Sequence, residues 1–166
     1  MVPHFTFAGY SGSGKTTLAI QVIKMLSDKG YKIAALKHDG HKFQMDKEGK
    51  DTYRLKEAGA KTVAISSQEK YAIISDSDHR LSFYELAKFL PDNLDIIIGE
   101  GFKEDSIPKI IVHRKDNLKS RACPDDKNVI AAATDCPEDF PEVKDIFSIN
   151  DVAGITDFIE RNILKA

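Results

Sequence analysis

A glycine-rich segment near the amino terminus constrains this chain more than any other feature of its sequence. The segment matches the spacing G-x-x-x-x-G-K-[ST] at every fixed position. Its residues are, in order, Gly9, Tyr10, Ser11, Gly12, Ser13, Gly14, Lys15 and Thr16. The apolar pattern predicts a strand over 4–8 before the segment and a helix after it. Strand, glycine-rich loop and helix in this order are the context of a phosphate-binding P-loop.

The residue types in this segment fit the chemistry of a nucleoside triphosphate. Glycines let backbone N–H groups curl around phosphate oxygens without Cβ clashes, and the start of the following helix favours negative charge. Lys15 can reach the β and γ phosphates, and the Thr16 hydroxyl can ligate Mg²⁺. Thr17 either assists the phosphate contact or only begins the helix. We therefore predict that the segment binds a nucleoside triphosphate with Mg²⁺.

Composition excludes several other classes of protein. The chain has 166 residues, 42% hydrophobic and 30% charged, which favours one folded domain over 1–166 rather than disorder. A net charge of −2 gives no general attraction to nucleic acid or to an anionic membrane. No apolar run is long enough to span a bilayer, so we expect a cytoplasmic protein. We expect neither nucleic acid nor a membrane among its partners. Cys123 and Cys136 lack the spacing of a zinc site or a disulfide framework.

Predicted strands and helices alternate along the rest of the chain. Strands are predicted over 31–37, 61–66, 70–75, 94–98, 107–113, 128–134 and 146–149, and helices over 51–58, 81–90 and 152–163. We expect the strand over 31–37 to be buried. Such alternation predicts an α/β fold, the three-layer P-loop NTPase fold, with a mostly parallel sheet flanked by helices. The two strands within about 61–80 are predicted to form a small antiparallel insertion.

Two carboxylates are candidates for the metal and the catalytic water. Glu100 follows the apolar run 96–98, where an acidic residue would ligate Mg²⁺, although a charged turn gives the same pattern. Asp39 comes just after the strand predicted over 31–37 and is placed near the metal or the attacking water. An ordinary Asp-Gly turn is the alternative for Asp39. Lys15, Asp39 and Glu100 are thus the predicted catalytic residues.

The nucleobase is less well specified by the sequence. The guanine-reading pattern Asn-Lys-x-Asp does not occur in the chain, so nothing in the residues alone selects guanine over adenine. Asp135 follows the strand predicted over 128–134, and its carboxylate can accept hydrogen bonds from guanine. The alternative is that Asp135 only begins a turn.

Several blocks of sequence together resemble a known family. These blocks are the segment Gly-Tyr-Ser-Gly-Ser-Gly-Lys-Thr-Thr, Lys-His-Asp-Gly-His at 37–41, Gly-Lys-Asp-Thr-Tyr-Arg at 49–54 before Ala-Gly-Ala at 58–60, and Gly-Glu-Gly-Phe-Lys at 99–103. Their types and order resemble MobB, the molybdopterin-guanine dinucleotide biosynthesis protein B family. The resemblance implies a dimeric GTP-binding protein with weak GTPase activity and with GTP and Mg²⁺ as cofactors. It also implies a role beside a MobA-like nucleotidyltransferase that attaches GMP to molybdopterin.

The same resemblance suggests residues for a second ligand. The segment after the second strand and the following insertion are associated in this family with dimerisation and with the cofactor or partner side of the site. The matching candidates here are Lys37, His38, Asp39, His41, Asp51 and Arg54. With Lys42, the basic members would suit an anionic ligand such as a pterin phosphate. A solvated loop and an ordinary short helix are the alternatives.

Two other classes of function share the P-loop. An ATP-dependent small-molecule kinase or ligase would have the same fold, with the basic loop over 114–121 as its only lid candidate. A nucleotide-gated adaptor would bind nucleotide without meaningful hydrolysis. The lack of an obvious catalytic Gln or arginine finger beside the P-loop favours that second alternative.

Overall fold

The structure is a computed structural model that describes residues 2–40, 43–117 and 120–165. The described residues fall into two compact units. The sheet unit comprises Met1–His38 and Ser82–Ala166, and the hairpin unit comprises Asp39–Leu81. No helix within the described ranges is both long enough and apolar enough to cross a membrane.

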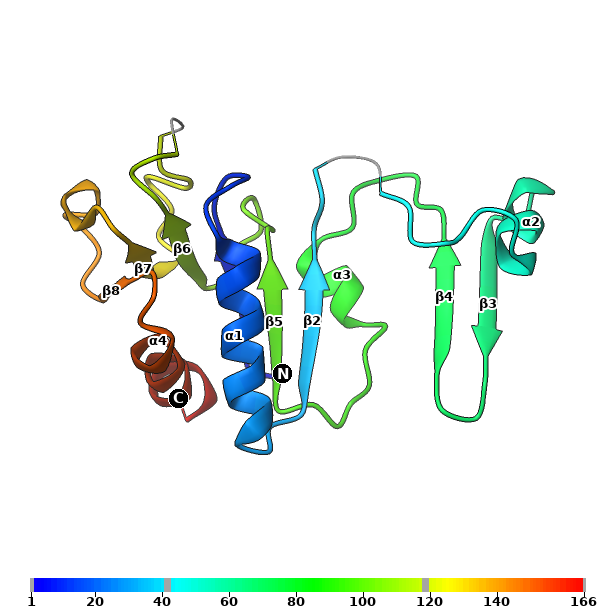
Figure 1. Cartoon of the computed structure of the whole chain (residues 1–166), viewed down its shortest axis with the longest axis horizontal. Helices are drawn as coiled ribbons and strands as arrows, with labels where there is room; N and C mark the ends of the chain where they lie inside the picture. Colours follow the sequence, from blue (N-terminus) through cyan, green and yellow to red (C-terminus); the bar gives the residue numbers. More distant parts are fainter. Residues whose placement is uncertain (1, 41–42, 118–119, 166) are drawn as a thin grey trace. The chain divides into compact units, whose positions relative to one another are not determined.

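Within the described residues, the sheet unit contains a six-stranded sheet in the order β2-β5-β1-β6-β7-β8, with every pair parallel. Its strands are β1 (His4–Ala8), β2 (Ile33–Lys37), β5 (Ile96–Glu100), β6 (Lys109–His113), β7 (Val129–Thr134) and β8 (Ile146–Ser148). The carboxyl ends of β2 and β5 and the loop after β1 lie at the upper edge in Figure 1. Ligands of open α/β sheets bind outside this edge.

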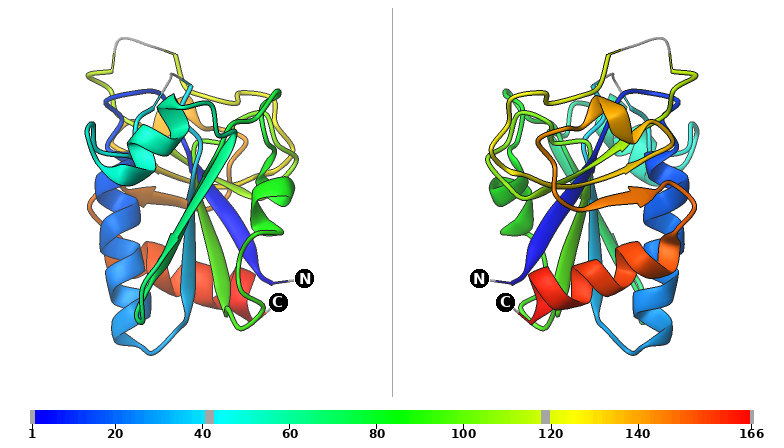
Figure 2. Two further views of the ribbon diagram at one scale, coloured as in Figure 1. Left: turned by 90° about the vertical axis from the view of Figure 1, so that its right-hand side faces the viewer. Right: turned by 90° about the vertical axis from the view of Figure 1, so that its left-hand side faces the viewer.

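Helices cover both faces of this sheet (Figure 2). One face carries α1 (Lys15–Asp28) and α4 (Val152–Ile159), the latter extended by the π-helical η2 (Glu160–Leu164). Alternate strand residues such as Phe5, Phe7 and Ile98 pack there against the helices. The opposite face carries α3 (Phe83–Ala87), where Phe83 packs with residues of the other parity such as Ile97. Side chains that alternate along the strands therefore pack on both faces of the sheet, against the helices that cover each face. The predicted three-layer fold is confirmed.

The short helix α3 is five residues shorter than the helix predicted over 81–90, two at its start and three at its end. Ser82 caps it, because its hydroxyl accepts from the N–H of Glu85 while the Glu85 side chain accepts from the N–H of Ser82. At the other end, the N–H groups of Phe89 and Leu90 bond carbonyls three residues back, which tightens the chain into turns. Local capping therefore decides these bounds.

The prediction that the strand over 31–37 is buried was wrong. β2 is an edge strand that pairs only with β5 in the described sheet, and Ala35 and Lys37 are exposed. An apolar run indicates a strand in an α/β sheet but does not give its position in the strand order.

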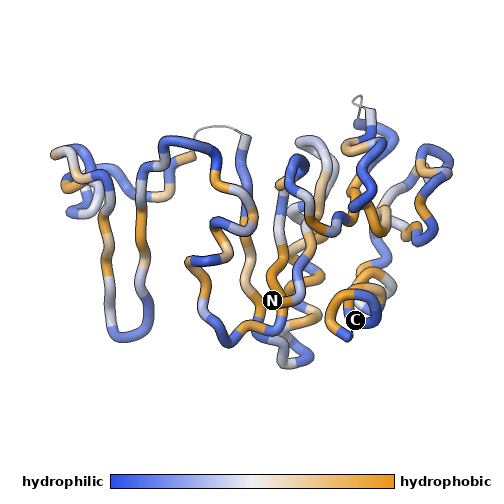
Figure 3. The backbone as a smooth tube through the Cα atoms, turned by 180° about the vertical axis from the view of Figure 1, so that it is seen from behind, coloured by the Kyte–Doolittle hydropathy of each residue, from blue (hydrophilic) through white to orange (hydrophobic). Residues whose placement is uncertain are grey.

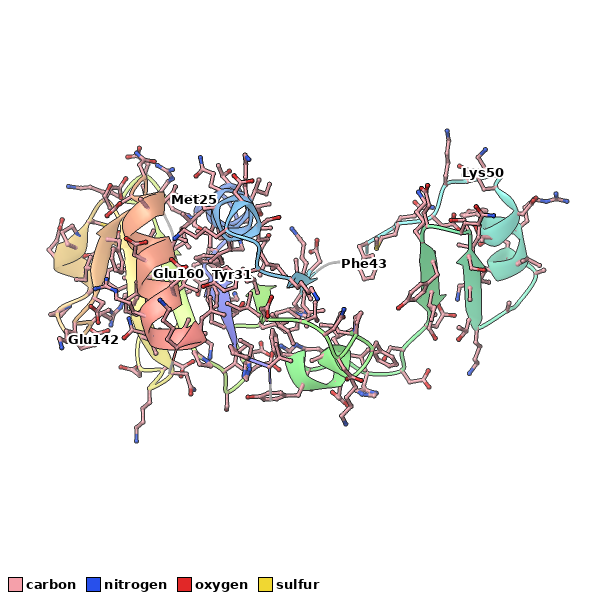
Figure 4. All side chains as sticks on the ribbon, turned by 90° about the horizontal axis from the view of Figure 1, so that it is seen from below. Met25, Tyr31, Phe43, Lys50, Glu142 and Glu160 are labelled. Atoms are coloured by element: carbon pink, nitrogen blue, oxygen red, sulfur yellow. The ribbon has the colours of Figure 1, made fainter. Side chains whose placement is uncertain are left out.

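The end of α4 is tied to the segment that follows α1. Tyr31 donates a 3.1 Å hydrogen bond to Glu160, and Lys29 forms an ion pair with the same carboxylate. Figure 4 labels Tyr31 and Glu160 at this junction. These bonds lower the pKa of Glu160, with the Lys29 hydrogen bond the largest cause.

The hairpin unit contains α2 (Asp51–Glu57) and an antiparallel pair of strands, β3 (Thr62–Ser66) and β4 (Tyr71–Ser75). The pair confirms the predicted antiparallel insertion. Hydrophobic stretches mark both strands in Figure 3. Much of this apolar surface is exposed, including Tyr71 at 67% and Ile73 at 62%.

Candidate nucleotide-binding site

The glycine-rich loop adopts a backbone that only glycine accommodates well. Gly12 and Gly14 have φ angles of +83° and +90°, in the left-handed region that disfavours side chains. A Cβ on Gly9 would collide with the carbonyl oxygen of Val112 on the neighbouring strand. The three glycines therefore allow a tight turn directly against the sheet.

The loop ends at the first turn of α1. Gly14 is the N-cap residue and can supply no side-chain cap, and the first turn of α1 contains no acidic residue. N–H groups at a helix start lack intrahelical partners and carry partial positive charge. The start of α1 thus presents backbone N–H donors at the place where the motif binds an anion. No carboxylate in the first turn of α1 competes for them.

Lys15 and Tyr10 organise the outer side of this loop. The Lys15 ammonium donates a 3.1 Å hydrogen bond to the carbonyl oxygen of Tyr10. The Lys103 ammonium lies 4.5 Å from the centre of the Tyr10 ring, within cation–π range. Two lysines from different elements therefore lie at the same end of the loop.

The two predicted magnesium ligands are in direct contact. The Thr16 hydroxyl donates a 2.8 Å hydrogen bond to Oε1 of Glu100, and the Lys37 ammonium lies 3.1 Å from the same oxygen. Glu100 is the last residue of β5, and Thr16 lies in the first turn of α1. A hydroxyl and a carboxylate side by side are oxygen donors suited to Mg²⁺ and to waters in its shell.

The segment after β5 fixes the position of Glu100. The N–H of Gly101 bonds the Phe7 carbonyl, and the Glu100 carbonyl accepts from the N–H of His38. Gly101 has a φ of +95°, and a Cβ there would lie 2.7 Å from the His38 oxygen. His38 also packs its ring against buried Phe102, with centroids 5.6 Å apart. His38, the residue after β2, thus supports the candidate metal site.

The loop after β6 adds two residues that the sequence did not assign to the phosphate site. Asn117 donates a 3.1 Å hydrogen bond to the Ser11 carbonyl, and a Cβ on Gly14 would lie 3.2 Å from Nε of Arg114. Within the described ranges, the Arg114 guanidinium makes neither a hydrogen bond nor an ion pair, although its charge acts on Asp135. The sequence signal for Asn117 and Arg114 was that they are polar residues just after a predicted strand. Only the strand order shows that this strand, β6, lies next to β1 and so brings them to the P-loop.

Asp135 lies at the end of β7 and is exposed. Its carboxylate accepts a 2.8 Å hydrogen bond from the N–H of Lys115. That bond is the largest cause of a lowered pKa for Asp135, and the charge of Arg114 adds to it. The carboxylate therefore stays ionised and connects the loops after β6 and β7.

The remaining predicted residues are placed as follows. Thr17 is exposed on the first turn of α1. Asp39, Asp51 and Arg54 belong to the hairpin unit, where the Arg54 guanidinium lies 3.8 Å from the Asp51 carboxylate. His41 and Lys42 lie outside the described residues. The roles of all these residues stay predictions.

The parallel strand order and the glycine-rich loop between β1 and α1 define an α/β protein of the P-loop NTPase fold. The chain belongs to the MobB family, because residues 4–135 match the sequence model described as "MobB: Molybdopterin guanine dinucleotide synthesis protein B". This match confirms the resemblance seen in the sequence.

Known proteins support the family over nearly the full chain. A protein of Haemophilus influenzae named "Molybdopterin-guanine dinucleotide biosynthesis adapter protein" is 38% identical over 96% of this chain and 88% of its own length. A protein of the same name from Escherichia coli strain K12 is 36% identical over 96% of this chain and 92% of its own. The crystal structure of Bacillus subtilis MobB is similar with a TM-score of 0.74, at 26% identity, over 97% of this chain and 98% of that one.

Proposed function

We propose that this protein is an adaptor in molybdopterin-guanine dinucleotide biosynthesis that binds GTP with Mg²⁺ and hydrolyses it weakly. The contact between Thr16 and Glu100 at the P-loop carries the nucleotide part of the proposal. The names of the relatives from Haemophilus influenzae and Escherichia coli support the pathway.

The residues of the P-loop have separate roles in this proposal. Backbone N–H groups over 12–16 bind the β phosphate, and Lys15 moves from the Tyr10 carbonyl to the phosphates. The Thr16 hydroxyl holds Mg²⁺ directly, and Glu100 holds it directly or through a water. When bound, Mg²⁺ neutralises charge on the β and γ phosphates.

Arg114 contributes a cation from the loop after β6. Its guanidinium lies against Gly14, where α1 begins, and has no ion-pair partner among the described residues. Guanidinium groups bind phosphate oxygens through directed N–H donors and also stack on aromatic rings. Arg114 therefore contacts the bound nucleotide, and Asp135 beside it reads the guanine edge.

Weak hydrolysis agrees with the residues at the γ-phosphate end. Arg114 is assigned to the nucleotide beside Asp135 and not to the γ phosphate, and the lack of an arginine at the γ phosphate accounts for a deficit of about 10³ to 10⁵ in the rate of related GTPases. The carboxylate of Glu100 is engaged by Thr16 and Lys37. Asp39 remains the proposed residue for orienting water, and a partner protein would accelerate the step.

The hairpin unit supplies the surface for a homodimer. Tyr71 and Ile73 of β4 belong to the same strand face and are largely exposed. Contiguous exposed apolar side chains mark surfaces for association in soluble proteins. The same unit carries Asp51 and Arg54, which we propose as contacts for the molybdenum cofactor or a MobA-like nucleotidyltransferase.

Calorimetry with non-hydrolysable GTP and ATP analogues tests this function. The parent protein with Mg²⁺ should prefer the GTP analogue, and Lys15→Ala should bind it at least about tenfold more weakly without a change in thermal unfolding. Preference for ATP would move the function to a kinase or ligase. Unchanged affinity in Lys15→Ala would remove the P-loop from the proposal.

GTP turnover with and without a MobA-like nucleotidyltransferase tests the adaptor role. Slow turnover that rises when the partner is added agrees with the proposal. Turnover of the isolated protein at the rate of a dedicated enzyme contradicts it.

A further inference from the structure

Three side chains of metal-binding types, none of them part of the P-loop, converge where β6 and β7 end in the sheet unit. His113, Cys136 and Asp139 each place one ligand atom within 4.8 Å of the others. His113 and Cys136 are buried, and the Asp139 side chain is 52% exposed. The cluster therefore combines two buried donors with one donor at the surface.

The fold, rather than the sequence spacing, assembles this cluster. His113 ends β6 and pairs in register with Thr134 of β7, so the loop after β7 begins beside its ring. Cys136 then caps the 3₁₀ turn η1 (Pro137–Asp139). Side chains three residues apart eclipse one another in a 3₁₀ turn, which places Asp139 on the same side as Cys136.

The donor set matches one class of metal ion. Thiolate, imidazole and carboxylate are the ligands of Zn²⁺, at about 2.3, 2.0–2.1 and 2.0–2.2 Å. The donor atoms lie at most 4.8 Å apart, and His113 Nε2 is 3.7 Å from Asp139 Oδ2. Even at the centre of a triangle with 4.8 Å sides an ion would lie about 2.8 Å from each corner, so an inward shift of at most about 0.5–0.8 Å per donor completes the bonds. We propose that His113, Cys136 and Asp139 form a three-ligand site for Zn²⁺ or a related divalent transition metal, with water as the fourth ligand.

The surroundings hold the donors in place. The Thr134 hydroxyl lies 3.2 Å from the Cys136 sulfur and accepts a 3.0 Å hydrogen bond from the Cys136 N–H. The Phe140 ring packs against the His113 ring, with centroids 6.0 Å apart. Partners that orient metal ligands in this way strengthen metal binding.

The local charges are also compatible with a cation. A thiolate and a carboxylate together neutralise a divalent ion, and metal binding releases the thiol proton to solvent. Arg121 approaches through a hydrogen bond to the Asp139 carbonyl, but Glu142 lies 2.5 Å from its guanidinium and offsets the positive charge. The exposed Asp139 carboxylate gives the ion and its water a route from solvent.

A metal at this site would order the turn next to Asp135, the candidate residue for binding the nucleobase. Asp135 immediately precedes Cys136, so a metal bound by Cys136 and Asp139 would fix the turn that begins at Asp135. The inference does not depend on the nucleotide proposal, because neither the P-loop nor Glu100 contributes a ligand.

Zinc titration of the metal-free full chain against a chromophoric chelator tests the site. We expect one Zn²⁺ per chain and a loss of affinity of at least about 100-fold in Cys136→Ser and in His113→Gln. Cys123→Ser changes the other cysteine and should bind Zn²⁺ like the parent. Equal zinc affinity in the parent and Cys136→Ser would overturn the proposal.

Cobalt substitution in the unchanged protein provides a test that does not rely on a variant folding. Co²⁺ should produce a thiolate-to-cobalt charge-transfer absorption and visible bands of tetrahedral cobalt. Zn²⁺ should abolish both signals by displacement. Absence of the charge-transfer band from the folded parent protein would also overturn the site.

Discussion

The hydroxyl of Thr16 donates a 2.8 Å hydrogen bond to the carboxylate of Glu100, across 84 positions of sequence. Parallel pairing of β1 with β5 brings the two residues together, because Phe7 lies in register with Glu100. The contact joins the start of α1 to the end of β5, so a change at Glu100 should affect the candidate magnesium site.

Glu100→Gln should weaken the magnesium dependence of nucleotide binding more than the binding itself. The amide keeps the size of the side chain and can still accept from Thr16, but it loses the negative charge that favours a cation. The Mg²⁺ concentration for half-maximal binding should rise about tenfold, equivalent to about 1.4 kcal/mol. Calorimetry at several Mg²⁺ concentrations measures this, with Glu104→Gln as a nearby carboxylate control. An unchanged requirement for Mg²⁺ would refute the metal role.

Arg114→Ala should reduce nucleotide affinity about 10- to 100-fold with little change in the free energy of unfolding. The guanidinium forms no hydrogen bond or ion pair with the described residues, so its removal breaks few contacts within the protein. Lys115→Ala is the matched control, because Lys115 holds Asp135 through its backbone N–H, which the substitution retains. Equal losses in both variants would indicate only a general charge effect.

Asp126→Ala should destabilise the fold by about 3–5 kcal/mol, because it leaves a buried ammonium without its anion. Lys109 is fully buried, lies 2.7 Å from Asp126 and donates to the carbonyl oxygens of Asp105 and Ile107. Lys109→Met removes the charge itself and should cost less. Urea unfolding of both variants measures the difference. A larger loss in Lys109→Met would contradict this account.

The same pair predicts a pH dependence of stability. Burial acts to raise the pKa of Asp126, but hydrogen bonds from Lys109 and Asn128 outweigh it, so the pKa falls below its ordinary value of 3.8. A carboxyl group with a depressed pKa in the folded state contributes stability above its unfolded pKa. That contribution should be lost as the pH falls below about 3.8 toward the folded value. As the pH is lowered below about 3.8, Asp126→Asn should therefore lose less thermal stability than the parent does.

Tyr71→Lys and Ile73→Lys should shift the protein from dimer to monomer. Both side chains are exposed on β4, and a lysine at an apolar interface carries a charge that association would desolvate. Light scattering after size-exclusion chromatography measures the mass. Phe89→Lys is the control, since Phe89 is 73% exposed in the sheet unit. A monomeric parent, or dimers in all three variants, would contradict the assigned surface.

Local patterns in the sequence predicted much of the fold. The strand over 4–8 and the antiparallel pair in the insertion lie within one residue of their predicted positions. The helix predicted over 152–163 begins at Val152, where Asp151 caps α4 by accepting from the N–H of Gly154. These features depend on residues close together in the chain, through strand alternation and helix capping. The bounds of α3 differed because its capping box and terminal turns were not recognised.

The sequence by itself determined the P-loop, the α/β class and the family, because each depends on the order of residues within short segments. Only the tertiary structure decided that β5 lies between β1 and β2, which places Glu100 against Thr16. It also decided that β6 and β7 pair in a register that brings His113 to Cys136. An apolar run indicates a strand but gives neither its burial nor its neighbour, because backbone hydrogen bonds between parallel strands are the same for any side chains.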